Sequence, residues 1–174
     1  MLELIKRCPE YTAGYREYCR EMYAQNVVFF RPPHPDTIDD GWFERTKDWY
    51  DKKENGLIPG KPVSFHYWAV DGGRFIGEFQ LRTEFTEQVL TGIGNVGYAV
   101  RPSEWRKGCG SEILRQGLLI ARSHGMERVM LNINEENTAS IRLCEKLGGT
   151  LLDRMEAYNP DEGQHVMRRY IIVV

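Results

Sequence analysis

The sequence predicts an α/β (α+β) fold: a mixed, mostly antiparallel central sheet flanked by helices. Three observations support this class. Four segments repeat apolar residues at helical spacing. Several other segments are rich in β-branched and aromatic residues, as strands are. Asp71-Gly-Gly73 lies between two of these strand-like segments and is typical of a hairpin turn. Strands and helices alternate in the second half of the chain, which favours some parallel pairing. The expected order is β-α-α-β-β-β-α-β-α-β-β.

Residues that break regular structure separate these elements. The run Arg31-Pro-Pro-His-Pro35 cannot continue a helix or a central strand. Either Asp36 or Thr37 is a suitable cap for the helix that follows. The segment 83–93 has no clear pattern. The expected elements are strand 2–7, helices 10–26 and 36–53, strands 63–70, 74–82 and 94–101, helix 108–123, strand 128–133, helix 138–147, and strands 150–158 and 165–173.

Length and composition narrow the class of protein. A chain of 174 residues is an ordinary length for one domain, so a single domain over 1–174 is expected. The formal net charge of −2 gives no reason to expect a nucleic-acid or membrane partner. No apolar run approaches the ~20 residues of a membrane span, and no signal layout begins the chain. The four cysteines and four histidines lack metal-binding spacing, which predicts reduced thiols, no metal and a cytoplasmic location.

The stretch Val96 to Leu114 carries the strongest chemical signal: a strand, a basic Gly-rich turn and a helix. A helix start exposes backbone N–H groups and the positive end of the helix dipole. Gly108 and Gly110 let a ligand approach that backbone, while Arg106 and Lys107 add positive charge. These features predict a phosphate or pyrophosphate site. The P-loop and GxGxxG patterns are absent. A Gly-rich turn with solvated cations is the alternative interpretation.

Three motifs resemble the GNAT superfamily of N-acetyltransferases. Trp105-Arg-Lys-Gly-Cys-Gly110 resembles its acetyl-CoA pyrophosphate loop, Gly97-Tyr-Ala-Val-Arg-Pro102 resembles the strand beside the thioester, and Asn137 to Gly148 resembles its second helix motif. The resemblance is clearest over 74–149, and the expected element order fits it from end to end. The run Arg168-Arg-Tyr-Ile also resembles a little-characterised bacterial branch. Two positions depart from the family pattern: Trp105 replaces a Gln or Arg, and Cys144 replaces a helix Tyr.

The resemblance implies that acetyl-CoA is the co-substrate and that no metal is needed. The backbone of the motif strand would hold the thioester, the Gly-rich loop would hold the pyrophosphate, and the second helix motif would contact CoA. Asn137 is also a suitable helix cap, and the two roles can coexist. The implied cofactor-binding residues are Tyr98, Ala99, Val100, Trp105, Arg106, Lys107, Gly108, Cys109, Gly110, Ser111, Asn137 and Ser140.

The implied reaction transfers an acetyl group to an amine, so an oxyanion donor, a base and an acid are sought. The backbone N–H of Val100 is the candidate donor and Glu78 the candidate base, acting directly or through water. A solvated strand residue, or an ion pair with Arg82, is the alternative for Glu78. Tyr158 is a candidate acid, as is Tyr170, although both also fit core-edge packing. Cys144 has the position of the family's acid, but packing suits a neutral thiol better.

The sequence therefore predicts an acetyl-CoA-dependent N-acetyltransferase whose acceptor is a primary amine of a small molecule or a protein. The alternative is a non-catalytic acyl-CoA-binding or regulatory module of the same fold. Most aromatic residues of the first half should be core, and the excess could line a pocket for a small amine. These aromatic residues are Tyr15, Tyr18, Tyr23, Phe29, Phe30, Trp42, Phe43, Trp49 and Tyr50. The cluster Asp36, Asp39 and Asp40 is either an attraction for a cationic acceptor or a solvated helix start. The terminal strands could complete the sheet or pair across a homodimer.

Overall fold

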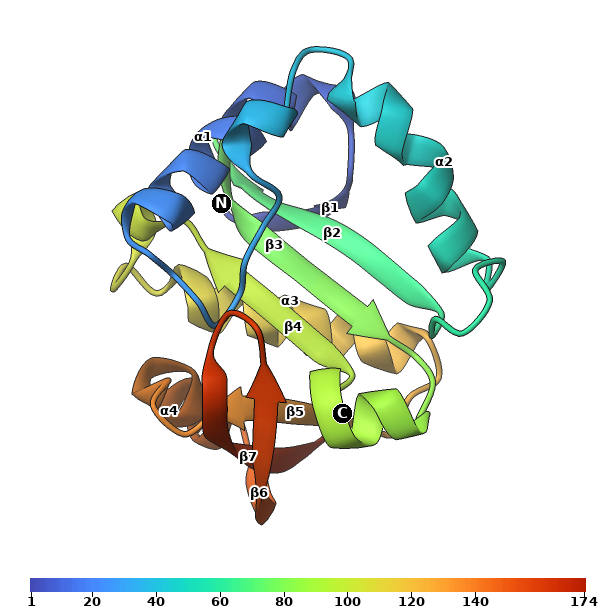
Figure 1. The fold of residues 1–174 in the computed structure, drawn as a ribbon, viewed down its shortest axis with the longest axis vertical. Coiled ribbons are helices and arrows are strands. Elements are labelled where there is room, and N and C mark those ends of the chain that lie inside the picture. The colour runs from blue at the N-terminus through green and yellow to red at the C-terminus, as the bar shows by residue number, and fades with distance from the viewer.

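The structure, a computed structural model, describes residues 1–174 and contains helices and strands in the expected order (Figure 1). The α/β class predicted from the sequence is confirmed. Most bounds differ from expectation by a few residues at either end. The strands are β1 (Glu3–Lys6), β2 (Ser64–Asp71), β3 (Arg74–Arg82), β4 (Val96–Val100), β5 (Arg128–Asn134), β6 (Thr150–Asn159) and β7 (Gly163–Val173), and the helices are α1 (Thr12–Ala24), α2 (Trp42–Glu54), α3 (Cys109–Ser123) and α4 (Thr138–Lys146).

The strands form two antiparallel sheets, in the orders β1-β2-β3-β4 and β5-β7-β6. The predicted hairpin at Asp71-Gly-Gly73 joins β2 to β3. The expectation of parallel pairing is wrong at the level of hydrogen-bonded ladders, because every ladder is antiparallel. The terminal strand β7 lies between β5 and β6 within the same chain, while a homodimer stays a prediction.

The two sheets meet at the start of β4. The Asn95 N–H donates to the Met130 carbonyl at 2.7 Å, and the Met130 N–H donates to Asn95 Oδ1 at 2.9 Å. The Asn95 amide also donates to the carbonyls of Arg82 and Glu84. Gly94 precedes this contact with a φ of +67°, and a Cβ there would lie 2.9 Å from the Met130 oxygen. Beyond this junction β4 and β5 form no ladder, and the space between them is open.

Helices cover both faces of the first sheet. In Figure 1, α1 and α2 lie on one face, and α3 lies behind the other. Tyr15 and Tyr18 of α1 pack with Trp68 and Phe75 into an aromatic core under α1 and α2. A second core joins α3 and α4 to both sheets. As expected, most aromatic residues of the first half are core.

Two segments differ from their sequence-based interpretation. The second helix begins at Trp42 instead of at 36–37, because Pro35–Thr37 forms a separate 3-10 turn and Asp39 Oδ1 accepts from the Gly41 N–H. The unassigned segment contains a π-helical turn, η3 (Val89–Ile93). Side chains from distant strands satisfy carbonyls of this turn: Asn132 bonds to Val89, Leu90 and Gly92, and Arg169 bonds to Leu90. A single turn held in this way has no periodicity that a sequence could display.

Replacing Asn95 should destabilise the fold strongly. Asn95→Ala leaves the Met130 N–H and two carbonyls without partners in a fully buried place, which should cost about 2–4 kcal/mol in the free energy of unfolding. Urea unfolding measures this loss. The control is Asn55→Ala, whose exposed amide makes one bond to the Asp51 carbonyl. Equal stability losses in the two variants would contradict the junction's role.

Candidate active site between β4 and β5

A cavity of about 520 Å³ opens beside β4 and the start of α3. Its walls come from four places: the end of α1 with the segment after it, β4, the loop before α3, and the start of α4. Most of the lining is apolar. The lining residues are Met22, Gln25, Asn26, Val27, Val28, Phe29, Phe30, Tyr98, Ala99, Val100, Glu104, Trp105, Arg106, Gly108, Cys109, Gly110, Asn137, Ala139, Ser140 and Leu143.

The start of α3 at this cavity has the features of an anion site. Gly108 adopts the left-handed conformation with φ +85° and leads into the helix at Cys109, and no side chain caps the helix start. The N–H groups of the first turn therefore lack intrahelical partners at the positive end of the helix. Arg106 lines the cavity, whereas Lys107 points to Glu104, which also accepts a 2.6 Å bond from Arg74.

Close packing fixes the loop against β4. The Trp105 indole N–H donates to the Val100 carbonyl at 2.8 Å, so Trp105 tethers the loop to the end of the strand. A Cβ on Gly110 would lie 3.4 Å from Leu143 and 3.7 Å from Val100. A larger side chain at 110 would therefore extend toward the cavity wall between α3 and α4.

A second cavity of about 250 Å³ lies in the opening between β4 and β5. It shares Phe29, Phe30, Tyr98, Asn137 and Ser140 with the first cavity, so the two meet there. Arg31 and Asp161 form a 3.1 Å ion pair between the segment after α1 and the β6–β7 turn. The two loops lie close together in Figure 1. The remaining lining residues are Arg82, Gly92, Ile93, Val96, Gly97, Leu131, Asn132, Ile133, Asn134, Asn159, Glu162 and Met167.

Tyr98 lines both cavities, and the protein provides no hydrogen-bond partner for its hydroxyl. It is buried and faces Ser140 without a well-formed hydrogen bond. Burial raises the pKa of Tyr98 to about 12, so the phenol is neutral at physiological pH. Asn137 Oδ1 accepts from the Ser140 N–H at 3.2 Å, which confirms the predicted cap of α4.

Glu78 lies away from both cavities. Its side chain is 6% exposed beneath α1, and the Tyr18 hydroxyl donates to its Oε1 at 2.9 Å. Burial raises the pKa of Glu78 to about 7, although the Tyr18 hydrogen bond and Arg7 act against this shift. In the β3–β4 register Glu78 is opposite Ala99, and Ala99 lines the first cavity. The ion pair with Arg82 considered from the sequence is not formed.

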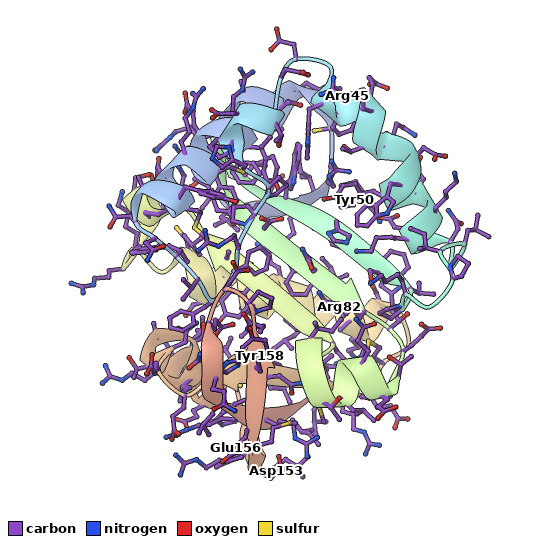
Figure 2. The ribbon with its side chains drawn as sticks, viewed as in Figure 1. Arg45, Tyr50, Arg82, Asp153, Glu156 and Tyr158 are labelled. Atoms are coloured by element: carbon purple, nitrogen blue, oxygen red, sulfur yellow. The ribbon has the colours of Figure 1, made fainter.

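The three candidate acids also lie outside the two cavities. Cys144 is buried against Gly149, and burial raises the pKa of its thiol to about 12. Tyr170 is buried, and its hydroxyl donates to Glu145 at 2.8 Å. Tyr158 is 71% exposed on β6, where Figure 2 labels it beside the hairpin. The surroundings of Cys144 and Tyr170 fit the packing roles considered from the sequence.

Comparison with known proteins identifies the family. The family model described as "Acetyltransferase (GNAT) domain" matches residues 10–150. The chain belongs to the GNAT acetyltransferase family. This confirms the resemblance carried by the three motifs, all of which lie inside the matched range.

Individual GNAT relatives agree with this assignment. A mycothiol acetyltransferase of Thermobispora bispora is 31% identical over 123 residues, which cover 67% of this chain and 38% of that enzyme. RimJ of Mycobacterium smegmatis, in complex with CoA-disulfide, aligns at a TM-score of 0.79 with 13% identity, covering 99% of this chain and 82% of that one. A putative acetyltransferase from Salmonella typhimurium, with its cofactor acetyl-CoA, aligns at 0.67 with 17% identity, covering 99% and 93%. At these identities the two structures show a shared fold.

Most of the expected cofactor residues of this GNAT acetyltransferase gather around one cavity. Ten of the twelve line the first cavity, and Lys107 and Ser111 do not. Of the aromatic residues in the first half of the chain, Phe29 and Phe30 line both cavities. Sequence reasoning missed the side chains that the second cavity draws from three separate strands and turns, and no motif links them. These are Arg82, Asn132, Asn134, Asn159 and Glu162.

The cysteines, the possible metal ligands and the helix lengths of this GNAT acetyltransferase also bear on the expectations from the sequence. All four cysteines are free, and no group of three or more His, Cys, Asp and Glu side chains is placed to hold a metal ion. No helix combines the length and apolar character that crossing a membrane requires.

The buried carboxyl of Glu78 should make stability depend on pH. Its pKa is about 7 in the folded chain and 4.5 as a reference value, so the folded state holds its proton more tightly. Stability from this group is therefore present below about pH 4.5 and is lost as the pH rises through 7, by roughly 3 kcal/mol in total. Glu78→Gln should abolish this loss, and urea unfolding at pH 5 and pH 8 measures it.

The matched control is Glu127→Gln, which changes an exposed carboxyl. The difference between pH 5 and pH 8 should match the parent in Glu127→Gln and shrink in Glu78→Gln. The same pH difference in all three proteins would show that Glu78 titrates as an ordinary exposed acid.

Proposed function

We propose that the chain is an acetyl-CoA-dependent N-acetyltransferase that acts on a primary amine by direct attack of the amine on the thioester. One observation carries this proposal: two cavities meet over β4, and one of them contains an uncapped helix N-terminus. Such a start suits a pyrophosphate. The second cavity supplies a separate approach to the same strand. The Salmonella typhimurium neighbour, described with acetyl-CoA as its cofactor, supports the choice of ligand.

The first cavity is the proposed acetyl-CoA site. The N–H groups at the start of α3, together with Arg106, would bind the pyrophosphate. Val27 to Phe30 and Leu143 provide an apolar passage to β4 for the rest of the cofactor. The thioester would lie against Tyr98–Val100, where the two cavities meet. Binding would then hold acetyl group and amine together, which is itself a large part of catalysis.

Proton transfer completes the proposed reaction. The backbone N–H of Val100 remains the proposed donor to the oxyanion that forms on attack. Glu78, with a pKa of about 7, has the acidity of an effective base, and its position behind Ala99 requires water to carry the proton. The Tyr98 hydroxyl, which has a free donor at the junction, is better placed than Tyr158 to protonate the departing sulfur. Loss of CoA needs little such help, because thiols have pKa values near ~8.5.

A second candidate function is an acyl-CoA-binding or regulatory module without catalysis. The burial of Glu78 and Cys144 away from both cavities favours it. Release of free thiol from acetyl-CoA in the presence of a panel of primary amines separates the two. Thiol release that depends on the amine supports the enzyme. Tight binding of acetyl-CoA with no amine-dependent release supports the module.

Obstructing the first turn of α3 should abolish acetyl-CoA binding. Gly110→Leu places a branched side chain where a Cβ already comes within 3.4 Å of Leu143. Titration calorimetry should show at least a 100-fold weaker dissociation constant, about 2.7 kcal/mol. Arg122→Leu, an equally apolar change at the exposed far end of α3, is the control and should bind normally. Unchanged affinity in folded Gly110→Leu would place the cofactor elsewhere.

The roles of Glu78 and Cys144 in turnover can be ranked. Alkyl amines keep their proton to about pH 10, so deprotonation is the harder proton transfer. Glu78→Gln should therefore slow turnover more than Cys144→Ala, and its loss should shrink at high pH, where free amine is abundant. Cys144→Ala should cost less than the ~100-fold expected of an acid–base residue.

A pH–rate profile of both variants with a working acceptor makes this comparison. If Cys144→Ala loses most of its turnover and Glu78→Gln turns over like the parent, the acid–base roles of the two residues are the reverse of those proposed. Circular dichroism at each pH shows whether lost rate reflects lost fold.

A further inference from the structure

Arg82 places a cation without an acidic partner in the wall of the second cavity. It lies at the end of β3, where Figure 2 labels it, and burial lowers the pKa of its guanidinium to about 10. Its hydrogen bonds go to the Gln80 side-chain oxygen at 2.8 Å and to the carbonyls of Gly94 and Ile93 at 3.3 and 3.5 Å. The two carbonyl bonds are long, so much of its donor capacity remains available.

The side chains near Arg82 also lack acidic partners. Lys53 and His66 lie on the same side of the sheet and contact each other at 3.1 Å, with no carboxylate bonded to either. Burial together with Arg82 and Lys61 lowers the pKa of Lys53 to about 8. Elsewhere in the chain a half-buried arginine such as Arg169 or Arg168 is paired with a carboxylate. A buried cation is costly unless an anion compensates it.

The geometry leaves room for an anion beside β4. Gly97 of β4 lies between Phe30 and Arg82: a Cβ there would be 3.5 Å from the Phe30 ring and 3.8 Å from Arg82 Nη1. The missing side chain keeps this place open within the second cavity. Two residues further along β4, about 7 Å away, Ala99 reaches the first cavity. A short molecule can therefore contact Arg82 at one end and present an amine at the meeting point of the cavities.

We infer that the amine acceptor carries a carboxylate that binds Arg82, and that it is a free amino acid with an apolar side chain. This inference rests on the proposed function and names its substrate class. Phe30, Ile133 and Met167 provide apolar walls for the side chain. The Arg–carboxylate pair has the planar, two-point geometry that makes such contacts selective. A cavity of about 250 Å³ fits a small acceptor.

Arg82 also serves the fold, since it bonds to carbonyls at the end of η3. A matched control separates this role from substrate binding. Arg169 bonds to the Leu90 carbonyl of the same turn at 3.1 Å but lines neither cavity. Arg169→Gln therefore removes a cationic contact from η3 and leaves the proposed carboxylate site intact.

The experiment compares leucine with leucinamide as acceptors, in which a neutral amide replaces the carboxylate. Because the amide also lowers the pKa of the amine, each kcat/KM is expressed per unprotonated amine. Free-thiol release from acetyl-CoA gives kcat/KM for each in the parent, Arg82→Gln and Arg169→Gln. The parent should prefer leucine by at least 10-fold. Arg82→Gln should lower kcat/KM for leucine about 10- to 100-fold, as expected for losing a charge-assisted pair, and leave leucinamide nearly unchanged. Arg169→Gln should keep the parent's leucine-to-leucinamide ratio.

A second variant protects the test against misfolding of Arg82→Gln. Gly97→Ala fills the place between Phe30 and Arg82 at contact distances that the fold tolerates. It should weaken leucine use and leave the calorimetric affinity for acetyl-CoA unchanged. Equal use of leucine and leucinamide by the parent, or an equal loss for both in Arg82→Gln, would overturn the inference.

Acetyl-CoA binding, measured separately, distinguishes failure of this inference from failure of the proposed function. If acetyl-CoA binds but leucine neither reacts nor binds calorimetrically to the loaded protein, the carboxylate inference fails and the acetyltransferase proposal stands. If acetyl-CoA does not bind, the proposed function fails, and the inference fails with it.

Discussion

The opening between β4 and β5 depends on the contact between Asn95 and Met130, which joins the two strands at one end. Backbone and side chain of Asn95 together hold the two strands, and the same amide supports the end of β3. Beyond this point, the residues that would continue a parallel ladder line cavities instead. An interior opening between strands exposes polar backbone, which proteins otherwise pair almost completely. A rigid junction at one end is what lets the opening persist without further unravelling.

Charge is distributed unevenly around this opening. The uncapped start of α3 and Arg106 make one end of the first cavity positive, while Lys107 is drawn aside by Glu104. Arg82 adds a positive charge to the wall of the second cavity at the far side of β4, and Glu162 adds a carboxylate from the β6–β7 turn. Glu78 lies beneath α1 with a pKa near neutrality. The site thus combines two places suited to anions with a neutral passage over β4, which matches a cofactor with a pyrophosphate and an acceptor with a carboxylate.

Local patterns in the sequence predicted much of the fold and the Gly-rich loop that lines the first cavity. Helical periodicity located α1 and α3, and the Asp71-Gly-Gly73 turn located the β2–β3 hairpin. The proposed anion site is also local, because adjacent residues in one loop form it. Local sequence patterns could not predict the features that are made by residues far apart in the chain. Arg82 meets Gly97 only through sheet register, and η3 exists because Asn132 satisfies its carbonyls. Glu78 alternates like a surface strand residue, yet α1 covers it.

The central claim is that acetyl-CoA lies over β4 with its pyrophosphate at the start of α3. Amide hydrogen exchange measured residue by residue, with and without acetyl-CoA, tests it most directly, because it reports on the N–H groups that would bind the ligand. The account predicts slowed exchange at Arg106–Ser111 and at Tyr98–Val100, with little change in β1 or α2. Protection confined to other segments, or none at saturating acetyl-CoA, would contradict it.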